Sequence, residues 1–326
     1  MGVKAVGLQI RRWRARGTSA GACSGESLPR TRCGVAAGSP TRTCANESGL
    51  ARIGLLLVAA FAGAIPLAAP AAAATAPVAA AQVRASYDAT TKFAAARDML
   101  KAHKVLEKAQ VFMSPLRLPR ELTIRTAECG ASFLPYDPAK GIITICYEAI
   151  AGIQDLAKGA TSDPDDLTAL VTGGVIEETL HCIAEAILRV FDVPLWGREE
   201  DAADLLAAFL MLKFDEPAAE VSIIGAARLF GYKTSAVGKV DYVSEISPPA
   251  QRFYNFLCVA YGGERLGFQG VVDKGFLPKS RAPHCSGEYN TIRKAFDLRL
   301  MPHVDPDLVV KVRAIDWLHY DLDKAP

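Results

Sequence analysis

Two segments of the chain carry acidic and histidine side chains at the spacing of an α-helix. Glu177 and His181 are four positions apart, and so are Glu200 and Asp204 further along the chain. Residues four apart lie on one face of a helix, so each pair can present two side chains to the same point. The four groups can meet only if the two segments form helices that pack side by side. We therefore expect a fold built around two adjacent helices whose polar faces meet.

The first pair is similar to the zinc motif His-Glu-x-x-His, in which both His bind the metal and the Glu is the general base. Glu178 and His181 match the Glu and the second His, while Glu177 replaces the first His. In Glu-type zincins, a later Glu-x-x-x-Asp motif supplies the third ligand and an Asp that orients the first His. We therefore expect Glu178 to act as the catalytic base and Asp204 to support the ligands. The expected ligands of Zn²⁺ are His181, Glu200 and Glu177.

More widely, the chain from about residue 87 to residue 303 resembles a family of bacterial metallopeptidases that carries a domain-of-unknown-function label. The resemblance rests on the helix with Glu178 and His181 and on these dispersed blocks: Cys129–Gly130, Ile145–Glu148, Val193–Asp204, Arg252–Cys258, Leu277–Ala282 and Cys285–Tyr289. It implies an α+β fold, a zincin-like domain that is mainly helical with a small sheet. We place this domain at residues 84–326.

Glu177 leaves two interpretations of the function open. A Glu/His/Glu set can bind zinc, but Glu178 and Asp204 would add two more carboxylates around one dication. Metal affinity should therefore fall, and preference should shift toward harder, oxygen-loving ions. Asp204 would also lose the imidazole N–H from which it normally accepts. The protein is then either an impaired metallopeptidase acting on a peptide or protein, or an inactive pseudopeptidase that serves as a peptide-binding or structural module.

Other interpretations compete with the metal site. Glu178 and His181 form an ordinary surface pair if no metal binds. Glu178-x-x-His181 also fits half of a di-iron carboxylate site, but such sites need a second pair, and Asp316-x-x-His319 is the nearest echo. Cys182 could be a nucleophile, although adjacent residues of a helix do not face each other. Nucleic-acid binding is not expected, because the basic N-terminal region lacks interleaved aromatic residues.

The N-terminal part differs in composition from the rest. Residues 1–52 hold nine Lys or Arg and two acidic residues, whereas the whole chain has a net charge of +2, which leaves −5 for residues 53–326. We expect residues 1–52 to be a disordered basic extension. Residues 53–82 contain an apolar run and an Ala/Pro-rich linker, the order found in a signal peptide. The alternative is a membrane anchor through residues 53–74; both place the domain outside the cytoplasm, in the periplasm or the extracellular space.

Cysteine usage agrees with export. Cys129 and Cys146 flank a strand–turn–strand pattern, while Cys258 and Cys285 fall within blocks of the family resemblance. The simplest pairing is Cys129–Cys146 and Cys258–Cys285. Cys182 is then left reduced.

Periodicity and turn residues predict the following elements: helices over 87–111, 167–190, 198–212, 251–261 and 286–300, and strands over 122–126 and 142–147. A turn over 137–141 separates the two strands. Gly173 and Gly174 lie inside the first site helix, where they would allow a neighbouring strand to pack closely.

Overall fold

A 27-residue helix, α4 (Pro164–Val190), crosses the centre of the computed structural model, which describes residues 83–130, 134–236 and 238–319. The helix begins where the Asp163 carboxylate accepts hydrogen bonds from the backbone N–H groups of Asp165 and Asp166. Pro164 occupies the first turn, where its missing N–H costs nothing. The expected basic extension and the expected signal peptide or anchor lie outside the described residues.

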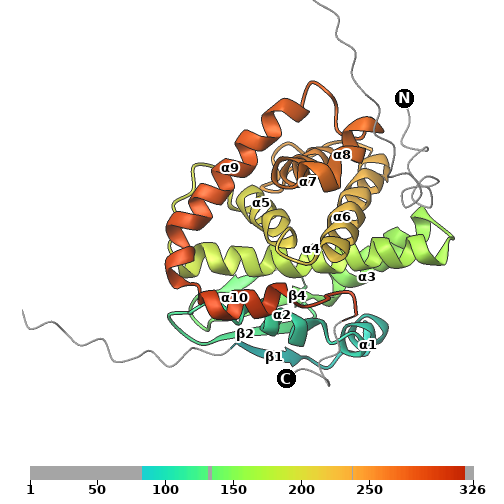
Figure 1. Cartoon of the computed structure of the whole chain (residues 1–326). Helices are drawn as coiled ribbons and strands as arrows, with labels where there is room; N and C mark the ends of the chain where they lie inside the picture. The colour runs from blue at the N-terminus through green and yellow to red at the C-terminus, as the bar shows by residue number, and fades with distance from the viewer. Residues whose placement is uncertain (1–82, 131–133, 237, 320–326) are drawn as a thin grey trace, which may run out of the picture. The chain divides into compact units, whose positions relative to one another are not determined.

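A four-stranded sheet lies on one side of α4 (Figure 1). The strands are β1 (Val83–Tyr87), β2 (Leu122–Ala127), β3 (Tyr136–Asp137) and β4 (Ile142–Cys146), in the order β1-β2-β4-β3. β1 and β4 run parallel to β2, and β3 runs antiparallel to β4. Both predicted strands are confirmed. Alternation along β2 buries Leu122 and Ile124 completely, as expected for a strand with one face in the core.

The single helix predicted over 87–111 is wrong. Tyr87 ends β1, and two shorter helices follow, α1 (Ala94–Ala102) and α2 (Val105–Met113). Lys104 separates them because its φ of 49° is left-handed, which a helix cannot contain. The apolar spacing survives the break, so periodicity alone could not reveal it.

The other helices build the rest of the domain. They are α3 (Tyr147–Ala160), α5 (Glu199–Met211), α6 (Glu216–Ala236), α7 (Pro249–Gly263), α8 (Arg265–Asp273), α9 (Ala282–Arg299), the 3₁₀ turn Met301–His303 and α10 (Pro306–Arg313). α5, α6 and α7 lie on the side of α4 opposite the sheet (Figure 1). The domain is therefore α+β, mainly helical with a small mixed sheet, as predicted.

Two disulfides tie distant elements together, and both match the predicted pairing. Cys129–Cys146 links the segment after β2 to the end of β4, and Cys258–Cys285 links α7 to α9. Cys182 is buried and reduced. Disulfides persist mainly in oxidising compartments, so the pairing agrees with an exported protein. Among the described residues, α4 alone is long and apolar enough to cross a membrane, but it is packed between the sheet and α5–α7 as a core helix.

Gly173 and Gly174 of α4 allow close packing of a neighbouring helix, α6, and not of a strand as expected. A Cβ atom on Gly173 would lie 2.5 Å from the backbone N of Ala226 and 2.6 Å from the Cα of Gly225, both in α6. Gly225 is itself as tightly placed, since its Cβ would lie 2.4 Å from the carbonyl oxygen of Ala169. α4 and α6 therefore touch backbone to backbone at this crossing.

This crossing makes Gly173→Ala a test of the packing. The variant is expected to lose about 1–3 kcal/mol of unfolding free energy in urea, because the methyl group meets backbone that cannot move aside. Gly152→Ala in α3 is the matched control, because nothing lies within 4 Å of its Cβ position. That change should be neutral or stabilise by roughly 0.5–1 kcal/mol. Equal effects of the two changes on the unfolding free energy would show that α4 and α6 do not touch backbone to backbone at Gly173.

Candidate metal centre

His181 is the centre of a polar cluster enclosed between α4, α5 and α7. Glu185 follows His181 by one turn of α4, while Glu200 lies in the first turn of α5 and Asp204 one turn later. The His181 side chain is only 11% exposed. The i,i+4 spacing thus operates on both helices, and α4 and α5 pack side by side as expected.

The Nε2 atom of His181 faces two carboxylates. Glu185 Oε1 and Glu200 Oε2 each lie 3.2 Å from Nε2. The three side chains offer one ligand atom each within 4.8 Å of one another. Glu185 Oε1 is buried, and its 3.2 Å approach to Nε2 is its closest polar contact to the ring without meeting the geometry of a hydrogen bond among the described residues. A buried oxygen without a donor normally has an explanation, and an ion is one of them.

The opposite ring nitrogen fixes the orientation of His181. Nδ1 lies 2.8 Å from Asp204 Oδ1, within hydrogen-bond distance. A carboxylate on one imidazole nitrogen directs the other nitrogen toward a metal and increases its basicity. The expectation that Asp204 lacks an imidazole partner is therefore wrong: its partner is His181.

Arg252 of α7 closes the far side of the cluster. Its Nη2 donates to Glu177 Oε1 at 2.8 Å and to Asp204 Oδ1 at 2.6 Å, and its Nε donates to Asp204 Oδ2 at 2.6 Å. The guanidinium also lies 4.2 Å from the centroid of the Phe230 ring, a cation–π contact. The Glu177 carboxylate is thus held by a cation.

The charges of the cluster shift its pKa values strongly. Burial alone would lower the pKa of His181, but the contacts to Asp204, Glu185 and Glu200 outweigh it and raise that pKa well above its usual value. Burial raises the pKa of Glu177 to about 7, although Arg252 opposes the shift. Burial also raises the pKa of Glu185, against the influence of His181. The imidazole therefore holds its proton firmly when no metal competes for it.

The residues around Nε2 fit a divalent ion. Ligands at about 2.0–2.2 Å from a tetrahedral zinc lie roughly 3.3–3.6 Å from one another, close to the separations found here. Imidazole nitrogen and carboxylate oxygen are both zinc ligands, although a set with two carboxylates also suits harder divalent ions. The four carboxyl groups of the cluster, those of Glu177, Glu185, Glu200 and Asp204, lie near the cationic side chains His181 and Arg252, with the charge of Arg189 acting on Glu185 and Glu200. Burial raises the pKa values of Glu177 and Glu185, and a bound cation would favour the ionised form of a carboxyl group that it contacts.

The contacts of His181 allow a second alignment of the motif, one helical turn later than the sequence interpretation. In this alignment His181 would be the first ligand, because it makes the contact with Asp204 that is expected for that position. Glu185, four residues later, would take the place of the second His, and Cys182 would stand where zincins have their general base. The segment would then read His-Cys-x-x-Glu at residues 181–185.

The other candidates take different places. Glu177 pairs with Arg252, and with His181 and Asp204 it forms a second group whose ligand atoms lie within 4.8 Å of one another. In that group Arg252 already neutralises Glu177 and Asp204. Glu178 is half-buried on α4, and its charge acts on Arg252 and Cys182. Burial raises the pKa of the Cys182 thiol well above its usual value, which disfavours a nucleophilic thiolate. Asp316 and His319 pair with each other at the surface.

The sequence interpretation missed Glu185 and Arg252. Glu185 could have been predicted from its spacing, because it is four residues after His181 and so lies on the same helical face. Arg252 is 48 positions from Asp204, and only the packing of α7 against α5 reveals their contact.

The comparisons with known proteins identify a family for this chain. A family model with the description "Putative metallopeptidase" matches residues 87–300, a range that holds α4, α5, α7 and every residue of the cluster. No curated protein and no solved structure matches the chain. The matched range covers about two thirds of the chain, so this protein belongs to that metallopeptidase family.

Proposed function

We propose that this chain is an exported, metal-binding member of its family and that it holds a divalent ion, zinc being the expected one, with His181, Glu185 and Glu200. The observation that carries the proposal is the approach of two carboxylate oxygens to within 3.2 Å of Nε2 while Asp204 holds Nδ1. The two disulfides and the apolar run over residues 53–69 support export.

We further propose that peptide hydrolysis is weak or absent. A bound zinc would polarise a peptide carbonyl and acidify a water, but hydrolysis also needs a base to accept the proton of the attacking water. Cys182 occupies that position, and its buried thiol carries neither the charge nor the reach of a carboxylate. This substitution favours the second candidate function, a pseudopeptidase that retains the metal and uses the domain to bind peptides or to support structure.

Metal binding by ligand variants tests the proposal. Purified full-length protein, freed of metal with a chelator, is expected to bind one zinc ion per chain by calorimetry and elemental analysis. Glu185→Gln and Glu200→Gln should each weaken binding by more than the ~10–100-fold that loss of a supporting residue costs, because each removes a direct ligand. Glu199→Gln is the matched control, since Glu199 lies on α5 but pairs with Arg189.

The same experiment separates the two alignments of the motif. If the ligands are those of the original sequence interpretation, Glu177→Gln will weaken zinc binding and Glu185→Gln will leave it unchanged. We expect the reverse order of effects. A protein that binds no zinc in any form would leave the cluster as a purely structural ion-pair network.

A further inference from the structure

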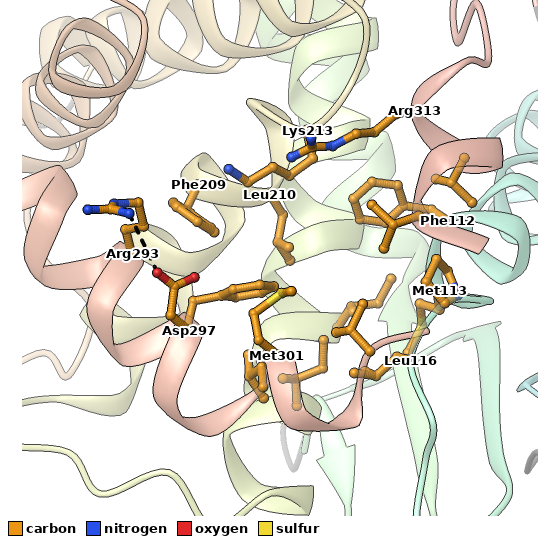
Figure 2. A pocket seen from close by; sticks show the side chains of 18 of the residues that line it. Phe112, Met113, Leu116, Phe209, Leu210, Lys213, Arg293, Asp297, Met301 and Arg313 are labelled. Carbon is orange, nitrogen blue, oxygen red and sulfur yellow. Dashed lines mark ion pairs between the residues drawn. The ribbon is translucent and has the colours of Figure 1, made fainter. Parts of the chain in front are cut away.

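A cavity lies beside α4, where Ile183 and Ile187 line it (Figure 2). Its volume is about 490 Å³, within the range of about 300–1,000 Å³ typical of small-molecule sites. Side chains of α2, α5, α9 and α10 complete the wall. None of the residues of the metal centre is part of this lining.

The wall of the cavity is mostly apolar. Phe112 and Met113 contribute from α2, Leu210 from α5, and Leu300 lies just beyond α9. Transfer of a hydrocarbon chain from water into an apolar space of this kind is favourable, and each buried methylene strengthens binding about fourfold. The cavity therefore suits the aliphatic part of a ligand.

Three cationic side chains gather at one edge of this apolar space. They are Lys213, Arg293 and Arg313, which come from the end of α5, from α9 and from the end of α10. Arg293 is paired with Asp297 at 3.6 Å. Lys213 and Arg313 form no salt bridge with any carboxylate in the described part of the chain. Three cations thus share one carboxylate, Asp297, which also lines the cavity and pairs with Arg293, so this edge carries an excess of positive charge.

Lys213 shows that this arrangement is unfavourable as it stands. Its Nζ lies 3.9 Å from the centroid of the Phe209 ring, so the aromatic face covers part of the ammonium group. Burial, and next the nearby charge of Arg313, lower the pKa of Lys213 to about 8, although Asp297 opposes the shift. An anion at this edge would offset the repulsion between Lys213 and Arg313.

We propose that this cavity binds a free fatty acid, with the aliphatic chain among the apolar side chains and the carboxylate between Lys213 and Arg313. Ammonium and guanidinium groups form strong, charge-assisted hydrogen bonds with a carboxylate. The acyl chain of a membrane phospholipid shares the apolar chemistry, but one cavity of this volume with cationic side chains at one edge fits a ligand with one chain and a small anionic head. The proposal is independent of the proposed metal centre.

Calorimetric titration of the full chain with dodecanoate tests the proposal. We expect saturable binding of one molecule per chain, and at least tenfold weaker binding of methyl dodecanoate, which lacks the charge. Lys213→Gln with Arg313→Gln should weaken dodecanoate binding at least tenfold and leave the methyl ester unchanged. Octanoate should bind more than a hundredfold more weakly than dodecanoate, because four fewer methylenes are buried.

A pair of variants on α10 links the binding to the cavity itself. Val309 lines the cavity, whereas its neighbour Val310 is 70% exposed and does not. Val309→Trp should fill the cavity and abolish dodecanoate binding, while Val310→Trp should leave it unchanged. The proposal is overturned if dodecanoate does not bind, if Val309→Trp binds it normally, or if the chain binds phospholipid vesicles but not dodecanoate.

Discussion

The double variant Cys182→Glu/Glu185→His is expected to convert this chain into a working zinc peptidase. It restores His-Glu-x-x-His at residues 181–185, with Glu200 as the third ligand and Asp204 already 2.8 Å from His181 Nδ1. A neutral imidazole in place of Glu185 reduces the crowding of carboxylates, so zinc should bind more tightly. The new carboxylate at position 182 would accept the proton of the attacking water. A positioned general base contributes typically 10²–10⁴-fold, so that is the gain in peptidase rate expected.

The matched control for this gain is Cys182→Gln/Glu185→His, which has the same size but no base. Both variants should bind zinc alike, and only the Glu form should cleave a labelled casein substrate. Cys182 is 1% exposed, so thermal unfolding must show that both variants fold. The alternative repair, Glu177→His, follows from the original sequence interpretation. It should give no activity, because an imidazole there would face the Arg252 guanidinium. Activity from Glu177→His alone would mean that the motif lies at residues 177–181 after all.

Local sequence patterns predict the strands, the site helices and the placement of Cys129 and Cys146 beside them, and these are confirmed. Cys258 and Cys285 lie in blocks of the family resemblance, and their predicted pairing is also confirmed. The break at Lys104 and the crossing at Gly173 depend on backbone contacts that periodicity does not encode. The fold class came from the family resemblance, whose blocks are spread across the whole domain.

Helical spacing predicts part of the candidate metal centre, and tertiary contacts decide the rest. Spacing correctly predicted that α4 and α5 would bring His181 and Glu200 together. It could not choose between two overlapping motifs, because Glu177 and Glu185 are both four residues from His181 and share its helical face. The choice depends on which ring nitrogen of His181 meets Asp204 and on the cation that neutralises Glu177. Both facts are tertiary, and Arg252 supplies the second from 75 positions away.

Removal of that cation should destabilise the fold strongly. Arg252 is 12% exposed, and its guanidinium is shared by Glu177 and Asp204, which are 7% and 5% exposed. Arg252→Gln leaves the Glu177 carboxylate buried without its counter-charge, while Asp204 keeps its contact with His181 Nδ1. Breaking a buried ion pair by removing one partner costs about 3–5 kcal/mol, so the unfolding free energy in urea should fall by that amount. Arg252→Lys should recover only part of the loss, because an ammonium group cannot form the fork of hydrogen bonds that a guanidinium forms.

Two further variants separate the buried charge from an ordinary ion pair. Arg189→Gln breaks the ion pair between Arg189 and Glu199, whose side chains are 42% and 31% exposed, respectively. The unfolding free energy should fall by less than about 1 kcal/mol. Glu177→Gln added to Arg252→Gln should restore roughly 0.5–3 kcal/mol of unfolding free energy, because a neutral amide then replaces the unpaired Glu177 carboxylate. If the double variant is no more stable than Arg252→Gln alone, Glu177 is not held by Arg252. The carboxylate would then be free to turn toward His181, and the assignment of the metal ligands would have to change with it.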